Sequence, residues 1–230
     1  MNIKKNIIYS IATCLSIVSF SSHAILENDL NESKRNWNFI AYLDNSEIGY
    51  HNFEVNISDS ETTVKTQAEF DVTFMFIPVF KYEHSNFEVW KNGCLIKLNS
   101  TTNNDGEDLF VNLSNNDGVT HIVTTSKKLS KPDCVRSFAY WNEELIKSRV
   151  LMNTQSGELL DITHKFVGAE KIIIYNKLVD TKRYQLQGKD EQGIDIDINL
   201  WYNTNNQWVA LESKLENDRV LRYQLKQEIR

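Results

Sequence analysis

Proline and glycine are scarce in this chain, which has two prolines and eight glycines among 230 residues. That composition excludes collagen-like repeats and proline- or glycine-rich disordered linkers. Basic residues are also in the minority, with 25 lysines and arginines against 31 aspartates and glutamates and a formal net charge of −6. Nucleic acids and anionic membrane surfaces attract basic patches. We therefore expect no nucleic-acid partner.

The common sequence motifs of catalysis and cofactor binding are missing too. The chain has no P-loop, no dinucleotide-binding glycine fingerprint, no GxSxG nucleophile elbow and no SxxK. His51, His84, His121 and His164 fall on four separate predicted strands, without the spacing of an HxH or HExxH metal site. We therefore assign no catalytic residue, no cofactor and no metal site from the sequence.

Only one long apolar run is present, and it lies near the N-terminus. Two lysines precede the mostly apolar run 7–20, and residues 22–24 have the small side chains of a cleavage site. This pattern is typical of a secretory signal peptide spanning residues 1–24. The run is shorter than the roughly 20 residues of a transmembrane helix. We expect cleavage before Ile25, a periplasmic or secreted protein, and no stable membrane span after signal cleavage.

Cysteine is rare as well, with three residues in the whole chain. Cys14 lies in the predicted signal peptide, where a lipoprotein site fits poorly because threonine precedes it. Cleavage leaves Cys94 and Cys134 in a protein bound for an oxidising compartment, where a structural disulfide is the default. The alternative, a reactive thiol or a metal pair, lacks a CxxC motif or a Cys/His cluster.

The mature chain is dominated by short alternating segments. Residues 25–36 are polar and predict an N-terminal arm, and the period changes to two from Trp37 onward. Asp105-Gly106 and Asp117-Gly118 predict tight hairpin turns. About twelve strands joined by hairpin-length connections predict a single all-β domain over 37–230. We expect a large curved antiparallel meander (a barrel, half-barrel or spiral roll) with one short helix. The predicted strands include 37–43, 48–57, 94–102, 109–113, 119–125, 159–167, 171–179, 182–187, 194–202, 208–215 and 220–226.

The predicted helix follows an aromatic stretch. Asn142 is a good N-cap, and two glutamates follow it in the first turn, where negative charge is favoured. Just before it lie Phe138, Tyr140 and Trp141. We expect these three aromatics, with the helix, to cover an apolar concave face of the sheet, either as packed core or as the lining of a ligand site.

Tyr82-Glu83-His84 is the other candidate site. Side chains alternate along a strand, so Tyr82 and His84 share one face while Glu83 points the other way. Tyr82 and His84 therefore join Phe138, Tyr140 and Trp141 as candidate ligand-binding residues, against the alternative of an ordinary half-buried pair.

A resemblance covers nearly the whole mature chain. It resembles an uncharacterised family of bacterial exported proteins, classed as a domain of unknown function, which implies export and an all-β fold but no activity. Glu143 departs from the family, which often has proline after the asparagine. By fold analogy the layout is also similar to periplasmic half-barrel and spiral-roll proteins of the cell envelope. The residues that carry the family resemblance are Trp37-Asn38-Phe39, Ile48-Gly49-Tyr50-His51, Tyr82-Glu83-His84, Gly93-Cys94, Phe138-Ala139-Tyr140-Trp141-Asn142, Leu200-Trp201-Tyr202 and Leu221-Arg222-Tyr223.

Two classes of function fit these observations. The first is a non-catalytic envelope protein that binds an apolar small molecule or an envelope protein segment on a curved sheet. The second is a hydrolase or transferase acting on envelope polymers, with a site assembled from distant strands. The missing catalytic motifs favour the first, so we expect no enzyme.

Overall fold

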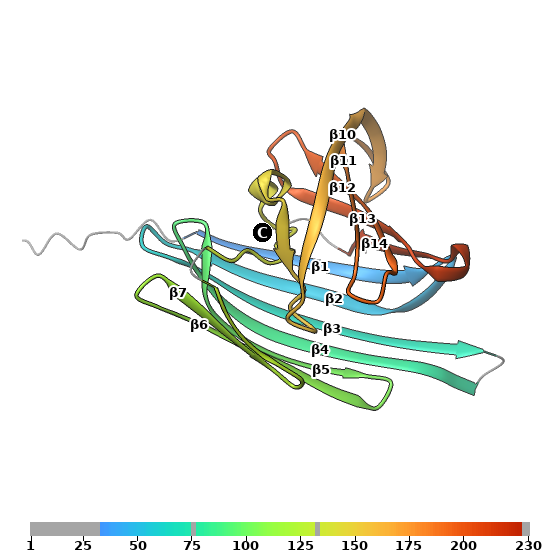
Figure 1. The fold of residues 1–230 in the computed structure, drawn as a ribbon. Helices are drawn as coiled ribbons and strands as arrows, with labels where there is room; N and C mark the ends of the chain where they lie inside the picture. The colour runs from blue at the N-terminus through green and yellow to red at the C-terminus, as the bar shows by residue number, and fades with distance from the viewer. Residues whose placement is uncertain (1–32, 75–76, 132–133, 227–230) are drawn as a thin grey trace, which may run out of the picture.

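One antiparallel sheet of fourteen strands makes up most of the molecule (Figure 1). The computed structural model describes residues 33–74, 77–131 and 134–226, so the predicted signal peptide lies outside the described residues. The sheet order is β8-β7-β6-β5-β4-β3-β2-β1-β14-β13-β12-β11-β10-β9. The strands are β1 (Ser33–Leu43), β2 (Ser46–Ile57), β3 (Thr62–Phe74), β4 (Ile77–Lys91), β5 (Cys94–Asn104), β6 (Glu107–Asn116), β7 (Val119–Thr124), β8 (Lys128–Lys131), β9 (Val150–Met152), β10 (Leu159–Ile174), β11 (Lys177–Lys189), β12 (Asp195–Asn203), β13 (Trp208–Lys214) and β14 (Val220–Leu225).

The first and last strands meet in the middle of the sheet. β1 pairs with β14, with Phe39 opposite Leu225, and a meander runs outward from each. The curved sheet does not close, because β8 and β9 are its two ends. The predicted curved antiparallel meander is confirmed, in its open form. Figure 1 shows β1 to β7 as one half and β10 to β14 as the other, with the yellow segment that follows β8 between them.

The two predicted Asp-Gly turns are present. Asp105 and Gly106 join β5 to β6 with φ of 53° and 92°, and Asp117 and Gly118 join β6 to β7 with φ of 51° and 82°. Two successive residues with positive φ match the twist of a hairpin, and glycine takes that conformation without a steric penalty. Local sequence therefore fixes these two connections.

The predicted helix is shorter than expected. Asn142 does cap it, accepting a hydrogen bond from the Glu144 backbone N–H at 3.0 Å, but only a short 3-10 helix of five residues forms, over Glu143–Lys147. Ser148 then has extended backbone angles, and Val150 enters β9, where it pairs with Asp161 of β10. Strand pairing with β10 ends the helix.

Several predicted strand boundaries were wrong. β1 begins at Ser33, four residues earlier than expected, because Ser33 pairs with Ile57 of the long β2. The expected breaks after 167 and 179 are absent: β10 runs on to Ile174 and turns at Tyr175 and Asn176, both with positive φ. The register shifts between Phe166 and Gly168, so this point of the strand has a bulge instead of a turn. The polar connection predicted over 126–133 contains β8, which pairs with β7.

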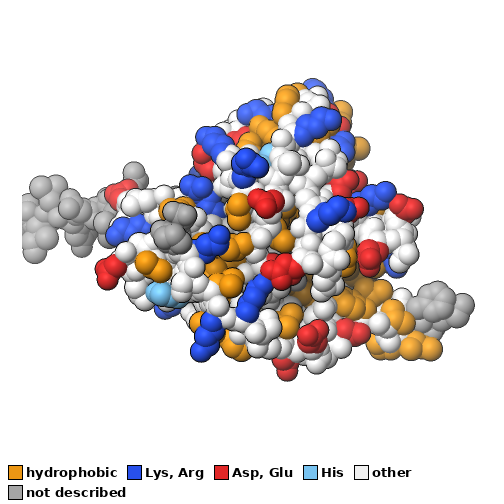
Figure 2. All heavy atoms as spheres, viewed as in Figure 1, with side chains coloured by type: hydrophobic (Ala, Val, Ile, Leu, Met, Phe, Trp, Pro, Cys, Tyr) orange, Lys and Arg blue, Asp and Glu red, His pale blue; other side chains and the backbone are white. Residues whose placement is uncertain are grey.

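The core lies on the concave side of the sheet. Its largest fully buried side chains include Trp37, Phe39, Tyr202 and Trp208, and the Trp37 indole N–H donates to the Trp208 carbonyl at 2.9 Å. These residues come from β1, β12 and β13, so the aromatic core sits where the two meanders meet. Figure 2 shows hydrophobic atoms reaching the surface between the two halves, with charged side chains around them.

Candidate functional site

A nine-residue segment, Cys134–Asn142, crosses between the two halves; we call it the cover segment. The Leu95 N–H of β5 donates to the Val135 carbonyl at 2.9 Å, and the Met152 N–H of β9 donates to the Arg136 carbonyl at 2.7 Å. Its backbone thus bridges the β5 side of the sheet to β9, one of the two end strands. These hydrogen bonds help to hold the segment in place over the concave face.

The predicted disulfide holds one end of the cover segment. Cys94, the first residue of β5, is bonded to Cys134, with 5.2 Å between the two Cα atoms. That separation is within the range of unstrained disulfides. The bond fixes the start of the cover segment at the β4–β5 turn, and the aromatic residues follow within a few positions.

The three aromatics of the cover segment face the concave side, and each is half-buried. Tyr140 packs on Trp208 with ring centroids 5.2 Å apart, and its carbonyl accepts a hydrogen bond from the Tyr202 hydroxyl at 2.9 Å. Trp141 meets Trp90 edge-on at 5.8 Å. The structure therefore brings Phe138, Tyr140 and Trp141 together over the sheet, with room beneath them.

That room is a cavity of about 590 Å³ between the cover segment and both halves of the sheet. This volume is in the range of small-molecule sites. β2, β3 and β4 form one wall, through His51, Phe53, Thr66, His84, Asn86 and Glu88. The opposite wall includes Ile194, Ile196 and Ile198 of the β12 region. Further along lie Lys214, at the end of β13, and Glu216 and Arg219 of the β13–β14 connection.

The first wall is more polar than the sequence predicted. Strand register places His51, Ala68, His84 and Thr102 in one row across β2 to β5. The next row along runs Phe53, Thr66, Asn86 and Ser100. We call the buried polar members of these rows, together with Glu88, the polar floor. Its residues are Thr66, His84, Asn86, Glu88, Ser100 and Thr102, all less than 9% exposed. The expectation of an apolar concave face is therefore wrong for β3 to β5.

His84 is held in the polar floor as a neutral side chain. Its Nδ1 lies 2.8 Å from the Thr102 hydroxyl, and its Nε2 lies 3.4 Å from Asn86 Nδ2. Burial lowers the pKa of His84 to about 4, because a charged imidazolium loses its hydration there. Burial, followed by the charge of His84, also lowers the pKa of His51 well below its usual range. Both rings are uncharged near neutral pH.

Tyr82 and Glu83 follow the predicted alternation. Tyr82 is buried and stacks on Phe70 with centroids 5.2 Å apart, and it lies 6.2 Å from the His84 ring on the same face. Glu83 points away and pairs with Lys81 at 2.6 Å. His84 lines the cavity, whereas Tyr82 packs beside it.

Glu88 is one of the polar-floor residues that the sequence did not predict. Its two oxygens accept from the Trp90 indole N–H at 2.7 Å and from the Ser137 hydroxyl at 3.3 Å. Burial raises the pKa of Glu88 to about 7, and these two hydrogen bonds act in the opposite direction. The sequence did contain a signal for Glu88: the two-residue period of β4 puts it on the same inward face as His84.

His84 and Glu88 line the same cavity but do not form an acid–base pair. They are four residues apart on β4, so their Cα atoms are roughly 13 Å apart along an extended strand. Asn86 lies between them, and each side chain has its own partners. His121 and His164 lie elsewhere, beside Ser130 and Ser148. Among the described residues, no three His, Cys, Asp or Glu side chains gather as metal ligands.

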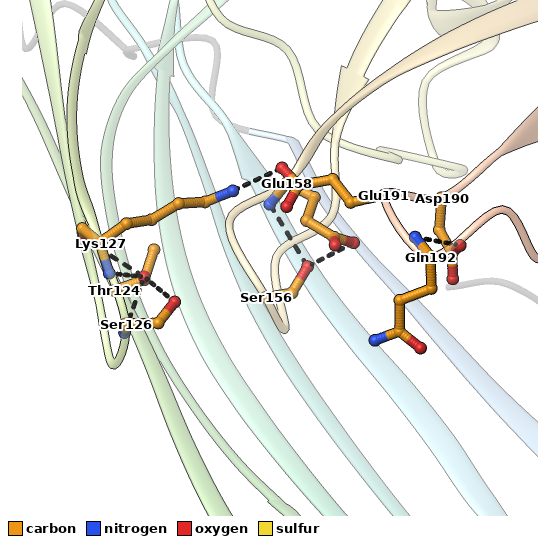
Figure 3. Close-up of polar contacts among 8 residues, drawn as sticks. All are labelled: Thr124, Ser126, Lys127, Ser156, Glu158, Asp190, Glu191 and Gln192. Atoms are coloured by element: carbon orange, nitrogen blue, oxygen red, sulfur yellow. Dashed lines mark hydrogen bonds and ion pairs between the residues drawn. The ribbon is translucent and has the colours of Figure 1, made fainter.

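The open side of the sheet is bridged by a polar contact. Lys127, in the β7–β8 turn, pairs with Glu191, in the β11–β12 turn (Figure 3). The β9–β10 loop lies beside it, where Ser156 donates to Glu158 at 3.1 Å. This contact joins turns from the two halves of the sheet.

These features define a β-barrel-like protein, built from one open antiparallel sheet around a covered cavity. The chain belongs to the family described as Domain of unknown function (DUF6134), whose model matches residues 39–226. This confirms the resemblance to an uncharacterised domain family. A comparison with curated proteins finds no match.

Solved structures share the fold. A β-barrel-like protein of the domain of unknown function DUF1849 from Brucella abortus superposes with a TM-score of 0.64 at 14% identity, covering 85% of this chain and 96% of that one. A "putative lipoprotein" from Parabacteroides distasonis ATCC 8503 has a TM-score of 0.36 at 12% identity, covering 86% and 95%. At these identities the first likeness supports the fold alone. Within the described residues, no helix has the length and hydrophobicity of a membrane span.

Proposed function

We propose that this is an exported, non-catalytic binding protein whose cavity holds a small molecule with a substantial apolar part. The observation that carries the proposal is the cavity of about 590 Å³ beneath the cover segment, with aromatic and aliphatic side chains beside a polar floor. Ligand sites are typically concave and mostly apolar, with a few placed polar groups. This cavity fits that description.

Binding is favoured over hydrolysis or group transfer by the partners of the titratable side chains. Glu88 is occupied by Trp90 and Ser137, and His84 by Thr102 and Asn86. A general base needs to reach the proton it abstracts, within about 3 Å or through one water. The Ser137 hydroxyl does meet the Glu88 carboxyl, but Ser137 is 1% exposed and is not among the residues that line the cavity, so this pair presents no nucleophile to a bound molecule.

A cavity-filling substitution tests the proposal. Ile196 is half-buried and lines the cavity, so Ile196→Trp should fill part of it. Ile173→Trp is the matched control, because Ile173 is 67% exposed on the β10–β11 hairpin. The uncharged fluorescent probe N-phenyl-1-naphthylamine would be titrated into the wild type and both variants, after circular dichroism and thermal melts confirm that each is folded.

We expect the control to bind the probe as the wild type does, and Ile196→Trp to bind it at least about ten-fold more weakly, equivalent to about 1.4 kcal/mol. Equal binding by all three proteins, or no binding by the wild type, would refute the proposal. Trp141→Ala gives a second measurement. Because Trp141 is half-buried above the cavity, this substitution should lower the free energy of unfolding by less than the roughly 3 to 5 kcal/mol lost when a fully packed aromatic is removed. It should also change the affinity for the probe.

A further inference from the structure

The charged side chains around the cavity show which ligands it suits. Its lining has three acidic residues, Glu88, Asp195 and Glu216, and two basic ones, Lys214 and Arg219. Both cations already have acidic partners: Lys214 pairs with Asp218 at 2.9 Å, and Arg219 with Asp44 at 2.6 Å. The polar floor itself contains no lysine or arginine. No cation lining the cavity is therefore left without a partner for an anionic head group.

The polar floor nevertheless has unused hydrogen-bonding capacity. Asn86 is 8% exposed, and its side-chain N–H group points to Thr154 and His84 while Oδ1 has no partner among the described residues. Oδ1 is an acceptor, and a buried acceptor without a partner is costly. A ligand that donates a hydrogen bond to it would remove that cost.

A donor also lacks a partner on the cover segment. The Trp141 indole N–H is buried and unpartnered among the described residues, and Trp141 lines the same cavity as Asn86. His51, whose Nε2 is likewise buried and unpartnered, lies on the same wall as Asn86. A hydroxyl or a primary amide can both donate and accept hydrogen bonds, and so matches this set.

We propose that the cavity selects amphipathic molecules with an uncharged polar head, such as a hydroxyl or an amide, over those with a carboxylate or phosphate head. This inference rests on the proposed function and specifies its ligand class. A carboxylate cannot donate to Asn86 Oδ1, and it would lose its hydration beside the buried Glu88 without gaining a cation. The apolar part of the ligand would lie against Phe53, Phe138 and the isoleucines of the opposite wall.

Three ligands with the same ten-carbon chain test the inference. Decanol, decanamide and decanoate would each be titrated against N-phenyl-1-naphthylamine bound to the wild-type protein at pH 7.5, with decanol and decanamide below their solubility limits and decanoate below its critical micelle concentration. Burying an unpaired charge is far less favourable than burying a hydrogen-bonded neutral group, so decanol and decanamide should bind at least about ten-fold more tightly than decanoate. This comparison uses the unaltered protein, so it holds even if a variant fails to fold.

A pair of variants locates the selecting group. Asn86→Leu removes the unpartnered acceptor, and Asn112→Leu is the matched control on an exposed position of β6. Asn86→Leu should weaken the binding of decanamide relative to that of the probe in the same variant by about five- to ten-fold, the usual range for a buried hydrogen bond, while Asn112→Leu should leave this ratio of affinities at its wild-type value. Decanoate binding as tightly as decanamide would overturn the inference and leave the proposed function standing. If none of the three ligands displaced the probe from a protein that binds it, the inference would also be overturned. Failure to bind the probe would refute the proposed function itself.

Discussion

Glu88→Gln should change how the stability of the protein depends on pH. Glutamine keeps the shape of the side chain and can still accept from the Trp90 indole and contact Ser137, the two partners of Glu88. It cannot ionise. The substitution therefore removes one titration from the interior of the sheet and leaves the packing in place.

The size and sign of the effect follow from the shifted pKa. Burial raises the pKa of Glu88 from 4.5 to about 7, a shift of about 2.5, and each pKa unit corresponds to about 1.4 kcal/mol. Between pH 4.5 and 7 the folded protein binds more protons at Glu88 than the unfolded chain does, so stability falls as pH rises. The contribution is fully present below pH 4.5 and is lost as pH rises through 7. It amounts to about 3 kcal/mol.

The buried histidines change the free energy of unfolding with pH in the opposite direction. Their contribution must therefore be separated from that of Glu88. The pKa of His84 is lowered from 6.5 to about 4, so its contribution is present above pH 6.5 and is lost as pH falls toward 4. His51 acts in the same direction. These contributions are common to the wild type and Glu88→Gln, so the difference between the two proteins isolates Glu88.

The assay is urea unfolding of both proteins at unit steps from pH 4 to pH 8, followed by tryptophan fluorescence. The free energy of unfolding of the wild type should fall by about 3 kcal/mol relative to Glu88→Gln across that range. Glu83→Gln, on the exposed face of β4, should leave the profile unchanged and serves as the control. Parallel profiles for wild type and Glu88→Gln would show that Glu88 is not buried as a proton-binding group.

Two further predictions concern the frame around the cavity. Replacing Cys94 and Cys134 by serine should lower the free energy of unfolding by about 4 kcal/mol, because the bond closes a loop of roughly 40 residues; thiol titration of the unreduced wild type should find neither cysteine free. Gly49→Ala should cost at least about 2 kcal/mol, because Gly49 has a φ of +146° and a Cβ there would lie 1.9 Å from a backbone oxygen of β3. Gly118→Ala is the control, since nothing lies within 4 Å of its added Cβ. Equal losses from both glycine variants in urea unfolding would contradict the close approach of β2 and β3.

Local patterns in the sequence determined the fold class. Alternation of polar and apolar residues indicates a strand with one buried face whatever its place in the sheet, so the hairpin of β1 and β2 could be predicted. Asp-Gly pairs favour tight turns through their own backbone preferences, so the turns at 105–106 and 117–118 could be predicted as well. The disulfide could also be predicted, because only two cysteines remain outside the predicted signal peptide. The shared face of Tyr82 and His84 follows from the two-residue period of a strand.

Other boundaries depended on pairing partners distant in sequence. Nothing local to Tyr175 and Asn176 resembles a glycine turn, yet the register of β10 against β11 places the turn there. Trp201 alternates with the buried Leu200 and Tyr202 of β12, and Glu170 and Arg183 of the β10–β11 hairpin cover it. Likewise, pairing of β9 with β10 limits the predicted helix to five residues. Strand register is set by the whole sheet.

The cavity was decided by the tertiary structure alone. The sequence shows that His51, His84 and Asn86 alternate inward, but only the register across β2 to β5 places them in adjacent rows. Burial raises the pKa of Glu88, and a hydrogen bond from Ser137 of the cover segment, 49 residues away in sequence, acts against that rise. A pKa depends on the surroundings of the group in three dimensions, and a local pattern contains no information about them.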